Sequence, residues 1–554
     1  MEAPIAVAPA VSMSRSTMLA SQPAAGLLKL QHVESPRVGS LGHRFPARNS
    51  LVTFAPLATA AAAVVGVVRR NRRERHLRYQ PKAEGRPAMT GGSLSSRARL
   101  SSQHSYFIVR RAEAELMGGF VTACSTAPQW QDAVDELAEA AGGGGFDAGF
   151  AFISEYHVTT EGLAPILEAL REKLGVRTLI GCAGIGGIGQ PAGPSAEAID
   201  SSNTNRAPIE VDSGAAMSVG LLRDAAATPF FLGSNGSGDL QLIDKKAADK
   251  DVRSMLLMAD PFGDHDSILK TLDDKFPKAA KAGGIAAVLQ VGGAERNAYT
   301  PSIAIASEGT QARLVSQGIA GLMLSNIDIH TVVCQGCLPV GPALRVSSTQ
   351  GPVCDGIGGK PSNETLRLIF SSVDPATRAK MQAFLTIGLG KVGENERLLG
   401  DGDWLVRMIT GVTPQGGLVI GDDVAVGQPM RFHVRDRESA ETDLSMMLKR
   451  YRLEKSFMGA SGDPMGCFLF TCSGRGEGLY GRKHVDARAI REVLGDIAGS
   501  RVAGFFCNGE IGSPGLAASR SATEDGGDTP RPTAVHGFTA VFAILVPAPQ
   551  GGSA

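Results

Sequence analysis

Apolar and polar positions alternate with two different periods along the first part of the chain's body. The apolar runs GFVTACST (119–126) and DAGFAFISEY (147–156) predict buried strands. Between them, PQWQDAVDELAEAA (128–141) opens on a proline and repeats apolar residues at helical spacing, so it predicts a helix. A second amphipathic helix at 159–175 leads into an apolar strand at 176–184. This β-α-β-α-β order favours a sheet with crossover helices.

Beyond this point short apolar segments alternate with Gly, Ser and Asp turns, up to a closing strand at 534–547. Strands and helices mix throughout, and no repeat of 20–50 residues is visible. We therefore predict an α+β protein of two mixed α/β halves, each a strand-rich sheet with flanking helices, packed together. The predicted domains are residues 104–335 and 336–548, with a short tail at 549–554.

Charge is divided unevenly along the 554-residue chain, although its formal net charge is zero. Residues 1–111 contain 17 Lys and Arg against 4 Asp and Glu, whereas residues 112–554 contain 38 against 51. An acidic body repels nucleic acid, so we expect no nucleic-acid partner. Eight cysteines in a chain of this length do not form a disulfide framework, and reduced, buried thiols are expected.

The head of the chain, residues 1–103, is rich in Ala, Ser, Pro and Arg and poor in acids. Its apolar run LVTFAPLATAAAAVVGVV (51–68) is followed directly by RRNRRERHLR. This composition is typical of organelle-targeting leaders and resembles the bipartite plastid leaders of algae. We predict a largely disordered, cleaved chloroplast transit peptide without a packed core. Mitochondrial targeting and a membrane anchor retained at 51–68 are the alternatives.

A glycine-rich stretch from Gly184 to Gly189 fits the G-x-G-x-x-G pattern of dinucleotide-binding loops and follows a strand. Such a site also needs a helix that begins in the loop and holds the pyrophosphate at its N-terminus. Pro191 and Pro194 follow instead, so we predict a turn between strands and no bound nucleotide or other cofactor.

A C-x-x-C pair is formed by Cys334 and Cys337. A structural zinc site normally needs four ligands, and only the irregularly spaced His330 and Cys354 lie nearby. The helix that follows a redox C-x-x-C is also absent. Neither a metal nor a redox dithiol is therefore expected, and the simplest interpretation is a strand that places one thiol inside the protein and one at the turn.

The stretch CFLFTCSGRGEGLYGRK (467–483) places Arg475 between two glycines at the end of an apolar strand. A guanidinium is a planar fork of donors suited to a carboxylate, and glycines let a ligand or a loop approach the backbone. Asn508 and Glu510 also follow an apolar strand, and His536 precedes a glycine. Two interpretations remain open here: an Arg475–Glu510 ion pair that joins two loops, or a ligand-binding cleft formed by the same residues.

A cysteine nucleophile is a further hypothesis for the same region. Cys182, Cys472 and Cys507 lie at strand ends beside glycines, and His536 could act as a base. A thiol-dependent hydrolase of this kind would need a lowered thiol pKa and a hydrogen bond from the histidine.

The order of CSGRG, GFFCNGEIG and HGFTAVFAIL resembles the C-terminal signature of the FIST domain family. The segments FDAGFAFIS and LREKLGVRTLIGCAGIGGIG resemble its N-terminal pattern, so the resemblance covers roughly residues 119–547. It implies a sensory module that binds small polar ligands, such as amino acids or related compounds, and does not convert them. It supplies no catalytic residue.

From this we predict a ligand-binding site in which Arg475 meets an acidic group and Glu510 an amino or hydroxyl group, with Asn508, His536 and Cys472 lining it. Nothing in the chain reads as a kinase, chemoreceptor, cyclase or F-box segment, so a separate protein partner is expected to receive the signal. The remaining alternative is an interaction or assembly subunit of a plastid complex, with an exposed apolar patch and filled surroundings at Arg475.

Overall fold

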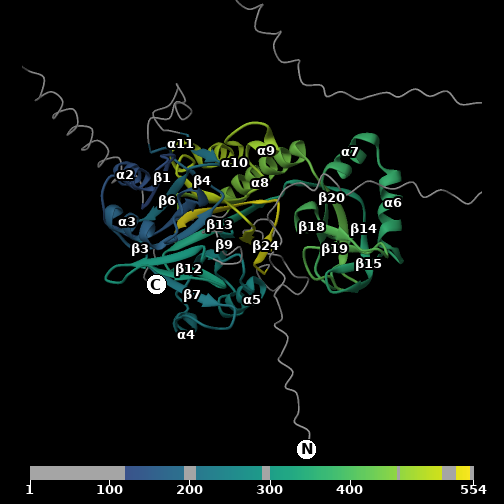
Figure 1. Ribbon diagram of the computed structural model, residues 1–554, viewed down its shortest axis with the longest axis horizontal. Coiled ribbons are helices and arrows are strands. Elements are labelled where there is room, and N and C mark those ends of the chain that lie inside the picture. The colour runs from purple at the N-terminus through teal and green to yellow at the C-terminus, as the bar shows by residue number, and fades with distance from the viewer. Residues whose placement is uncertain (1–118, 193–206, 290–299, 458–461, 514–531, 549–554) are drawn as a thin grey trace, which may run out of the picture. The chain divides into compact units, whose positions relative to one another are not determined.

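The computed structural model describes residues 119–192, 207–289, 300–457, 462–513 and 532–548, which all belong to the same unit of the chain. Mixed α/β content in several strand-rich sheets confirms the predicted fold class (Figure 1). The predicted leader and its apolar run lie outside the described residues. Among the residues that are described, no helix is both long and apolar enough to cross a membrane.

The first sheet contains the predicted β-α-β unit. Its strands, in spatial order, are β1 (Phe120–Ser125), β6 (Met217–Leu222), β2 (Phe146–Ser154), β3 (Val176–Gly184), β10 (Ile303–Ser307) and β11 (Arg313–Val315). Only β2 and β3 run parallel, and the crossover helix between them is α3 (Ala164–Leu174). The helix α2 (Trp130–Ala141) ends at Gly142, whose φ of 74° is in the left-handed region that glycine tolerates. Both predicted helices and all three predicted strands are therefore confirmed.

Two further six-stranded sheets are arranged in the same way: one pair of neighbouring strands is parallel, and all other pairs are antiparallel. The second contains β24 (Ala534–His536), β23 (Glu510–Gly512), β9 (Ala280–Ile285), β8 (Ser254–Ala259), β12 (Gly318–Leu324) and β7 (Ala227–Gly233). The third contains β13 (Ile327–Cys334), β25 (Ala540–Pro547), β21 (Gly466–Cys472), β22 (Val502–Cys507), β4 (Gly186–Gly189) and β5 (Ile209–Val211). The parallel pairs are β8 with β9 and β21 with β22.

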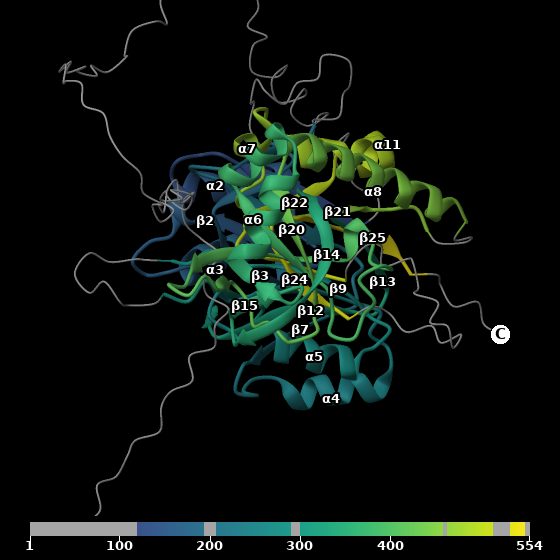
Figure 2. The ribbon, with the colours of Figure 1, turned by 90° about the vertical axis from the view of Figure 1, so that its right-hand side faces the viewer.

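The three sheets share one apolar core. Phe152 of the first sheet stacks on Phe505 of the third at 5.0 Å between ring centroids, and Met258 of the second joins the same cluster. The other face of each sheet is covered by helices. These are α2 and α3 on the first, α4 (Leu240–Asp249) and α5 (His265–Lys275) on the second, and α8 (Arg437–Phe457), α10 (Val485–Ala489) and α11 (Arg491–Ala498) on the third (Figure 2). This layering buries both faces of the central strands, which explains why the sequence shows continuous apolar runs.

The chain crosses between sheets at the end of the second strand of each parallel pair. It passes from β3 to β4 in the third sheet, from β22 to β23 in the second, and from β9 towards β10 in the first. One backbone hydrogen bond accompanies each crossing. They run from Ile185 N–H to Phe506 O (3.1 Å), from Asn508 N–H to Ile285 O (3.0 Å) and from Ala287 N–H to Ala183 O (2.8 Å). The three sheets are thus joined in a closed ring of equivalent contacts.

Glycine occupies the same place in all three parallel pairs. Gly181, Gly283 and Gly504 each lie two residues before the carbonyl group that accepts one of these hydrogen bonds, opposite Ala151, Leu257 and Leu469 in register. An added Cβ at Gly504 would lie 1.9 Å from the carbonyl oxygen of Leu469. A side chain therefore has no room where these strands meet.

Residues 337–435 form a separate antiparallel sheet between β13 and α8. In order it contains β14 (Cys337–Gln350), β20 (Pro429–Arg435), β17 (Leu385–Leu389), β18 (Leu405–Val412), β19 (Leu418–Ile420), β15 (Val353–Ile357) and β16 (Lys360–Pro361). Because β14 also pairs with β15, the sheet closes on itself as a small barrel. Apolar side chains such as Ile387, Met430 and Phe432 fill it, and α6 (Ser362–Ser372) and α7 (Pro375–Ala383) accompany it.

The predicted domain boundary at residues 335/336 falls between β13 and the barrel. The rest of the fold does not divide there, because the third sheet takes β4, β5 and β13 from before the boundary and β21, β22 and β25 from after it. We call the three sheets and their helices the body, and residues 337–435 the barrel.

The glycine-rich stretch 184–189 runs directly from β3 into β4, with only Ile185 between them. Strand β4, and not the predicted turn, therefore occupies most of the motif. No helix begins within it, which confirms that part of the prediction. Gly186 lies so close to β5 that a Cβ would be 1.9 Å from the carbonyl oxygen of Val211, so these glycines serve strand packing.

Candidate functional site

Several of the predicted site residues gather at one edge of the third sheet. The parallel strands β21 and β22 both end there, with Cys472 opposite Cys507. Strand β13 ends at Cys334 and β25 begins at Ala540, directly opposite one another at the same edge. The carboxyl ends of parallel strands are a usual place for ligand sites in α/β proteins.

Arg475 lies in the turn after β21 and is only 1 % exposed. Its Nε donates to Asp486 Oδ2 at 2.8 Å and its Nη2 to Asp486 Oδ1 at 2.9 Å, a bidentate ion pair. Asp486 also accepts hydrogen bonds from Tyr480 (2.8 Å) and Thr471 (2.9 Å). Of the two interpretations left open by the sequence, the Arg475–Glu510 ion pair is therefore wrong, because the carboxylate that Arg475 binds is that of Asp486 on α10. We call Thr471, Arg475, Tyr480 and Asp486 the arginine network.

The glycines beside Arg475 leave space for side chains from elsewhere in the protein to approach the backbone. A Cβ on Gly474 would lie 2.6 Å from Nη1 of Arg435, a barrel residue that donates to the carbonyl oxygen of Gly474. Gly476 has a φ of 68°, and a Cβ there would lie 2.9 Å from the carboxylate of Asp212. Close approach was thus predicted correctly, but the groups that approach belong to the chain itself, and Arg475 is not at the rim of a cleft.

Burial makes the electrostatics of this network strong. Burial by itself would raise the pKa of Asp486, but the charge and hydrogen bonds of Arg475 bring it below its ordinary value. The neighbouring Glu210 on β5 shows the opposite shift, because burial and the charge of Asp486 raise its pKa to about 8. The charge of Arg475 is thus compensated inside the protein by the buried carboxylate of Asp486.

Glu510, at the start of β23, is completely buried. Its Oε2 accepts hydrogen bonds from the amide (3.1 Å) and hydroxyl (2.6 Å) of Thr539, and its Oε1 accepts from the thiol of Cys507 at 3.4 Å. Burial raises the pKa of Glu510 to about 7 despite these donors. Close to neutral pH, this carboxyl group can therefore either hold or release a proton.

Arg475 and Glu510 are linked indirectly, because they bind two consecutive residues, Phe538 and Thr539. Nη1 of Arg475 donates to the carbonyl oxygen of Phe538 at 3.5 Å, while Glu510 binds Thr539. Phe538 has a φ of 66°, an unfavourable conformation for a residue with a side chain. The surrounding contacts must hold this residue in place, which is common at functional positions.

Asn508 lies in the crossing between β22 and β23. Its Nδ2 donates to the carbonyl oxygen of Ala286 at 3.2 Å, so its Oδ1 points elsewhere, and no described group donates to that oxygen. The residue is 8 % exposed. A buried acceptor without a partner is unfavourable and calls for an explanation.

His536 on β24 is the strand partner of Glu510 but does not bind it. Its Nε2 lies 3.1 Å from the carbonyl oxygen of Gly512, and burial lowers its pKa to about 4. The imidazole is therefore neutral at pH 7 and oriented by the backbone of β23.

The thiols do not have the properties that a nucleophile needs. Burial is the first cause that raises the pKa of both Cys472 and Cys507, and the charge of Glu510 raises them further. Cys182 is fully buried, and its Sγ is 3.6 Å from the sulfur of Met258. Nε2 of His536 contacts the carbonyl oxygen of Gly512, so neither of the two features expected of a hydrolase is found among the described residues.

Cys334 and Cys337 are buried free thiols, and burial raises the pKa of each, in Cys337 to about 11. Within the described part of the chain, no group of three or more His, Cys, Asp or Glu side chains could hold a metal ion.

The barrel meets the body at this same edge. The ring of Phe384 contacts that of Phe538 at 5.5 Å, and Arg435 lies over Phe538 at 5.4 Å. Gln335 Nε2 donates to the carbonyl oxygen of Trp404 at 2.9 Å. We call Cys472, Asn508, Glu510, His536 and Thr539 the strand-end site. It therefore lies next to the contact between the two parts.

Sequence reasoning missed Asp486, Tyr480 and Thr539. Asp486 lies eleven residues after Arg475 at the start of a predicted helix, where a carboxylate is usually explained by the helix dipole. Thr539 is the last residue of HGFT, two residues after its glycine, and only its hydroxyl could have suggested a partner for Glu510.

Comparison with known proteins gives a consistent result. The FIST N domain family matches residues 147–360 and the FIST C domain family matches residues 365–513. An uncharacterized protein of Mycobacterium tuberculosis is 31 % identical over 340 residues, which is 61 % of this chain and 80 % of that protein. An uncharacterized protein of Mycobacterium bovis is 32 % identical over 340 residues, 61 % of this chain and 79 % of that protein.

Proposed function

The chain belongs to the FIST domain family of small-ligand sensory modules, and from this premise we propose that it senses a small amine-bearing ligand, such as an amino acid, at the strand-end site. The ligand's amino group donates to Glu510 and to Oδ1 of Asn508. Its binding alters the contact between barrel and body, and a partner protein receives that change.

The observation that carries this proposal is the unpartnered Oδ1 of Asn508, two residues before a carboxyl group with a pKa of about 7. Both groups are acceptors, so they favour a donor. A cationic amine suits them best, because it favours the ionised form of Glu510.

Access to this site depends on the barrel. Asn508 is 8 % exposed and Cys472 is 9 % exposed, whereas Glu510 is fully buried. A ligand reaches Glu510 when the ring of Phe384 moves away from that of Phe538. This requirement couples binding to the barrel contact and provides the output of a sensor.

Arg475 has a positioning function in this proposal and does not touch the ligand, unlike our expectation from sequence. It binds Asp486 and Tyr480, and it holds the carbonyl oxygen of Phe538 beside Thr539. The acidic group of an amino-acid ligand is therefore left to other residues.

The test is a thermal-shift screen of amino acids and small amines on the full chain, followed by calorimetry on any ligand found. Glu510→Gln should weaken binding roughly 10- to 150-fold, the value of a charge-assisted contact of about 1.5–3 kcal/mol. Glu308→Gln, an exposed glutamate on the first sheet's side of the body, is the matched control and should bind like the parent.

Proton release gives an independent measurement. An amine that favours ionised Glu510 releases a proton on binding, so affinity should rise with pH up to about 7 and then level off. Unchanged affinity of Glu510→Gln for a ligand that binds the parent would refute the proposed site.

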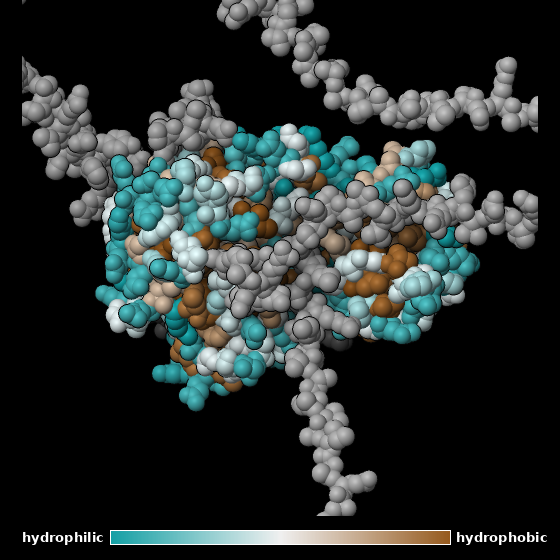
Figure 3. Space-filling model, in the orientation of Figure 1, coloured by the Kyte–Doolittle hydropathy of each residue, from teal (hydrophilic) through white to brown (hydrophobic). Residues whose placement is uncertain are grey.

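A second candidate, an assembly subunit, is supported by the filled surroundings of Arg475. On the face seen in Figure 3, apolar residues form separate groups among polar ones. If no amine stabilises the chain but a partner protein does, this candidate replaces the sensor.

A further inference from the structure

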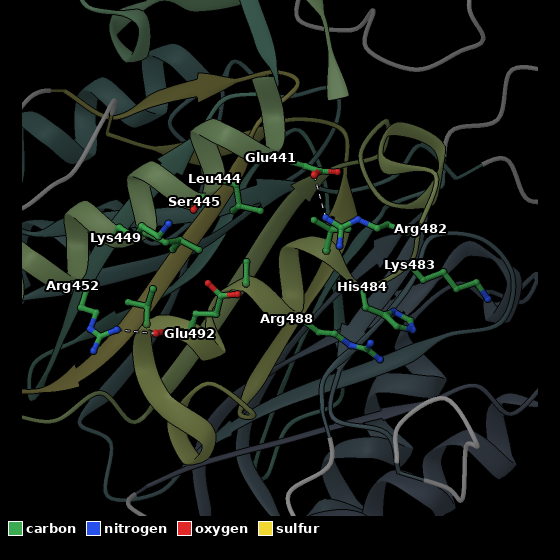
Figure 4. A pocket seen from close by; sticks show the side chains of 14 residues that line it. Glu441, Leu444, Ser445, Lys449, Arg452, Arg482, Lys483, His484, Arg488 and Glu492 are labelled. Carbon is green, nitrogen blue, oxygen red and sulfur yellow. Dashed lines mark hydrogen bonds and ion pairs between the residues drawn. The ribbon is translucent and has the colours of Figure 1, made fainter. Parts of the chain in front are cut away.

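A groove lined with positive charge lies beside the segment that carries Asp486 (Figure 4). Its volume is about 400 Å³, within the range of small-molecule sites. Helix α8 forms one side, and residues 482–493 form the other. Among the described residues that line it, the cations are Lys449, Arg452, Arg482, Lys483 and Arg488, and the carboxylates are those of Glu441 and Glu492.

The floor of this groove is apolar. Ala489 on α10 and Val493 on α11 line it and are partly exposed, above the buried side chains of Leu444 and Leu448 on α8. The groove therefore offers an apolar surface next to cations, which suits an organic anion better than an inorganic one.

Glu441 neutralises little of this charge. Arg482 lies 3.2 Å from Oε2 of Glu441, and Arg437, which does not line the groove, lies 3.0 Å from Oε1 of the same side chain. One carboxylate is thus shared between two guanidinium groups.

Arg452 and Lys449 add charge that no ion pair with a described carboxylate compensates. Nη1 of Arg452 donates to the backbone carbonyl of Glu492 at 3.4 Å, which is not a charged group. Lys449 is exposed and forms no hydrogen bond or ion pair with any residue that the structure describes. An excess of cations is notable here, because residues 112–554 carry more acidic than basic residues.

The segment 482–488 is held in place from inside the protein. Asp486 is bound by Arg475, the Ala487 amide donates to Glu210 at 2.6 Å, and the Glu210 amide donates to Nδ1 of His484 at 2.8 Å. The cations on its outer side are thus positioned before any ligand arrives, which lowers the entropy lost on binding.

We propose that this groove binds a small organic phosphate monoester, with the phosphate at Lys449 and the neighbouring arginines and the apolar part on Ala489 and Val493. A phosphate monoester carries close to two negative charges at neutral pH, and guanidinium groups match its oxygens. The site is separate from the strand-end site and does not depend on it.

Phenyl phosphate is the probe, titrated calorimetrically into the full chain at low ionic strength. It should bind more tightly than inorganic phosphate, which lacks the apolar part, and than benzoate, which has one charge. Lys449→Gln should weaken binding about fivefold, as expected for one exposed charge. Added salt should weaken it as well.

Two variants serve as controls. Lys245→Gln removes an equally exposed helical lysine from α4, and Glu510→Gln alters the strand-end site; both should bind phenyl phosphate like the parent. Binding to Lys449→Gln that equals the parent's, or benzoate binding as tightly as phenyl phosphate, would overturn the proposal. So would the absence of binding at millimolar probe.

Discussion

Replacing Asp486 by Asn tests whether the arginine network holds the edge of the third sheet together. The substitution keeps the size of the side chain and its ability to bind Thr471 and Tyr480, but leaves the guanidinium of Arg475 as an unpaired buried charge. Both side chains of the ion pair are 0 % exposed, and their contacts are 2.8 and 2.9 Å. We expect a large loss of folding free energy.

The size of the loss follows from this geometry. Two unit charges about 4 Å apart attract by about 4 kcal/mol at an effective dielectric constant of 20. Breaking a buried pair by removing one partner costs about 3–5 kcal/mol in other proteins. Asp486→Asn should therefore lower the free energy of unfolding by that amount. The double variant Arg475→Met/Asp486→Asn removes both charges and should recover at least about 2 kcal/mol.

The assay is equilibrium urea unfolding at pH 7, followed by circular dichroism, with midpoints compared at a common slope. Measurement at pH 7 keeps Asp486 ionised, since its pKa lies below the ordinary value of 3.8. Asp274→Asn is the control, because its 2.7 Å pair with Lys270 is 65–75 % exposed and should contribute less than about 0.5 kcal/mol. A cost for Asp486→Asn as small as the control's, or a double variant equal to the sum of its singles, would refute the reasoning.

Two further predictions concern Glu510 and Gly504. The pKa of Glu510 is raised from 4.5 to about 7, so the native state holds its proton more tightly than the unfolded state, and this stabilisation is lost as the pH rises from 4.5 to 7. Glu510→Gln should therefore reduce the loss of unfolding free energy over this pH range by about 3 kcal/mol, measured by urea unfolding at several pH values. Parallel pH profiles of the variant and the parent would contradict this. Gly504→Ala places a Cβ 1.9 Å from Leu469 O and should cost about 3 kcal/mol or more of stability, whereas Gly478→Ala, with no atom within 4 Å of its Cβ, should melt like the parent.

Local pattern determined much of this protein. The apolar runs at β1, β2, β3 and β21 and the amphipathic spacing of α2 and α3 predict these elements, because burial and periodicity are properties of ten to fifteen neighbouring residues. Gly474 and Gly476, on either side of Arg475, also predicted that other groups approach the backbone closely there. The order of the short strand-end motifs indicated the FIST family, which the family matches confirm.

Tertiary structure alone decided which charged and polar residues became partners. The fork of Arg475 could satisfy either Glu510 or Asp486, and the choice depended on α10 folding back over the end of β21. The crossings that place β4 in the third sheet and β23 in the second join segments more than two hundred residues apart, so no local period reports them. The cationic groove arises in the same way, since Lys449 and Arg488 face one space only after α8 and α10 have packed on the same sheet. Sequence specifies which residues are buried or charged, whereas long-range strand register and helix packing decide which of them meet.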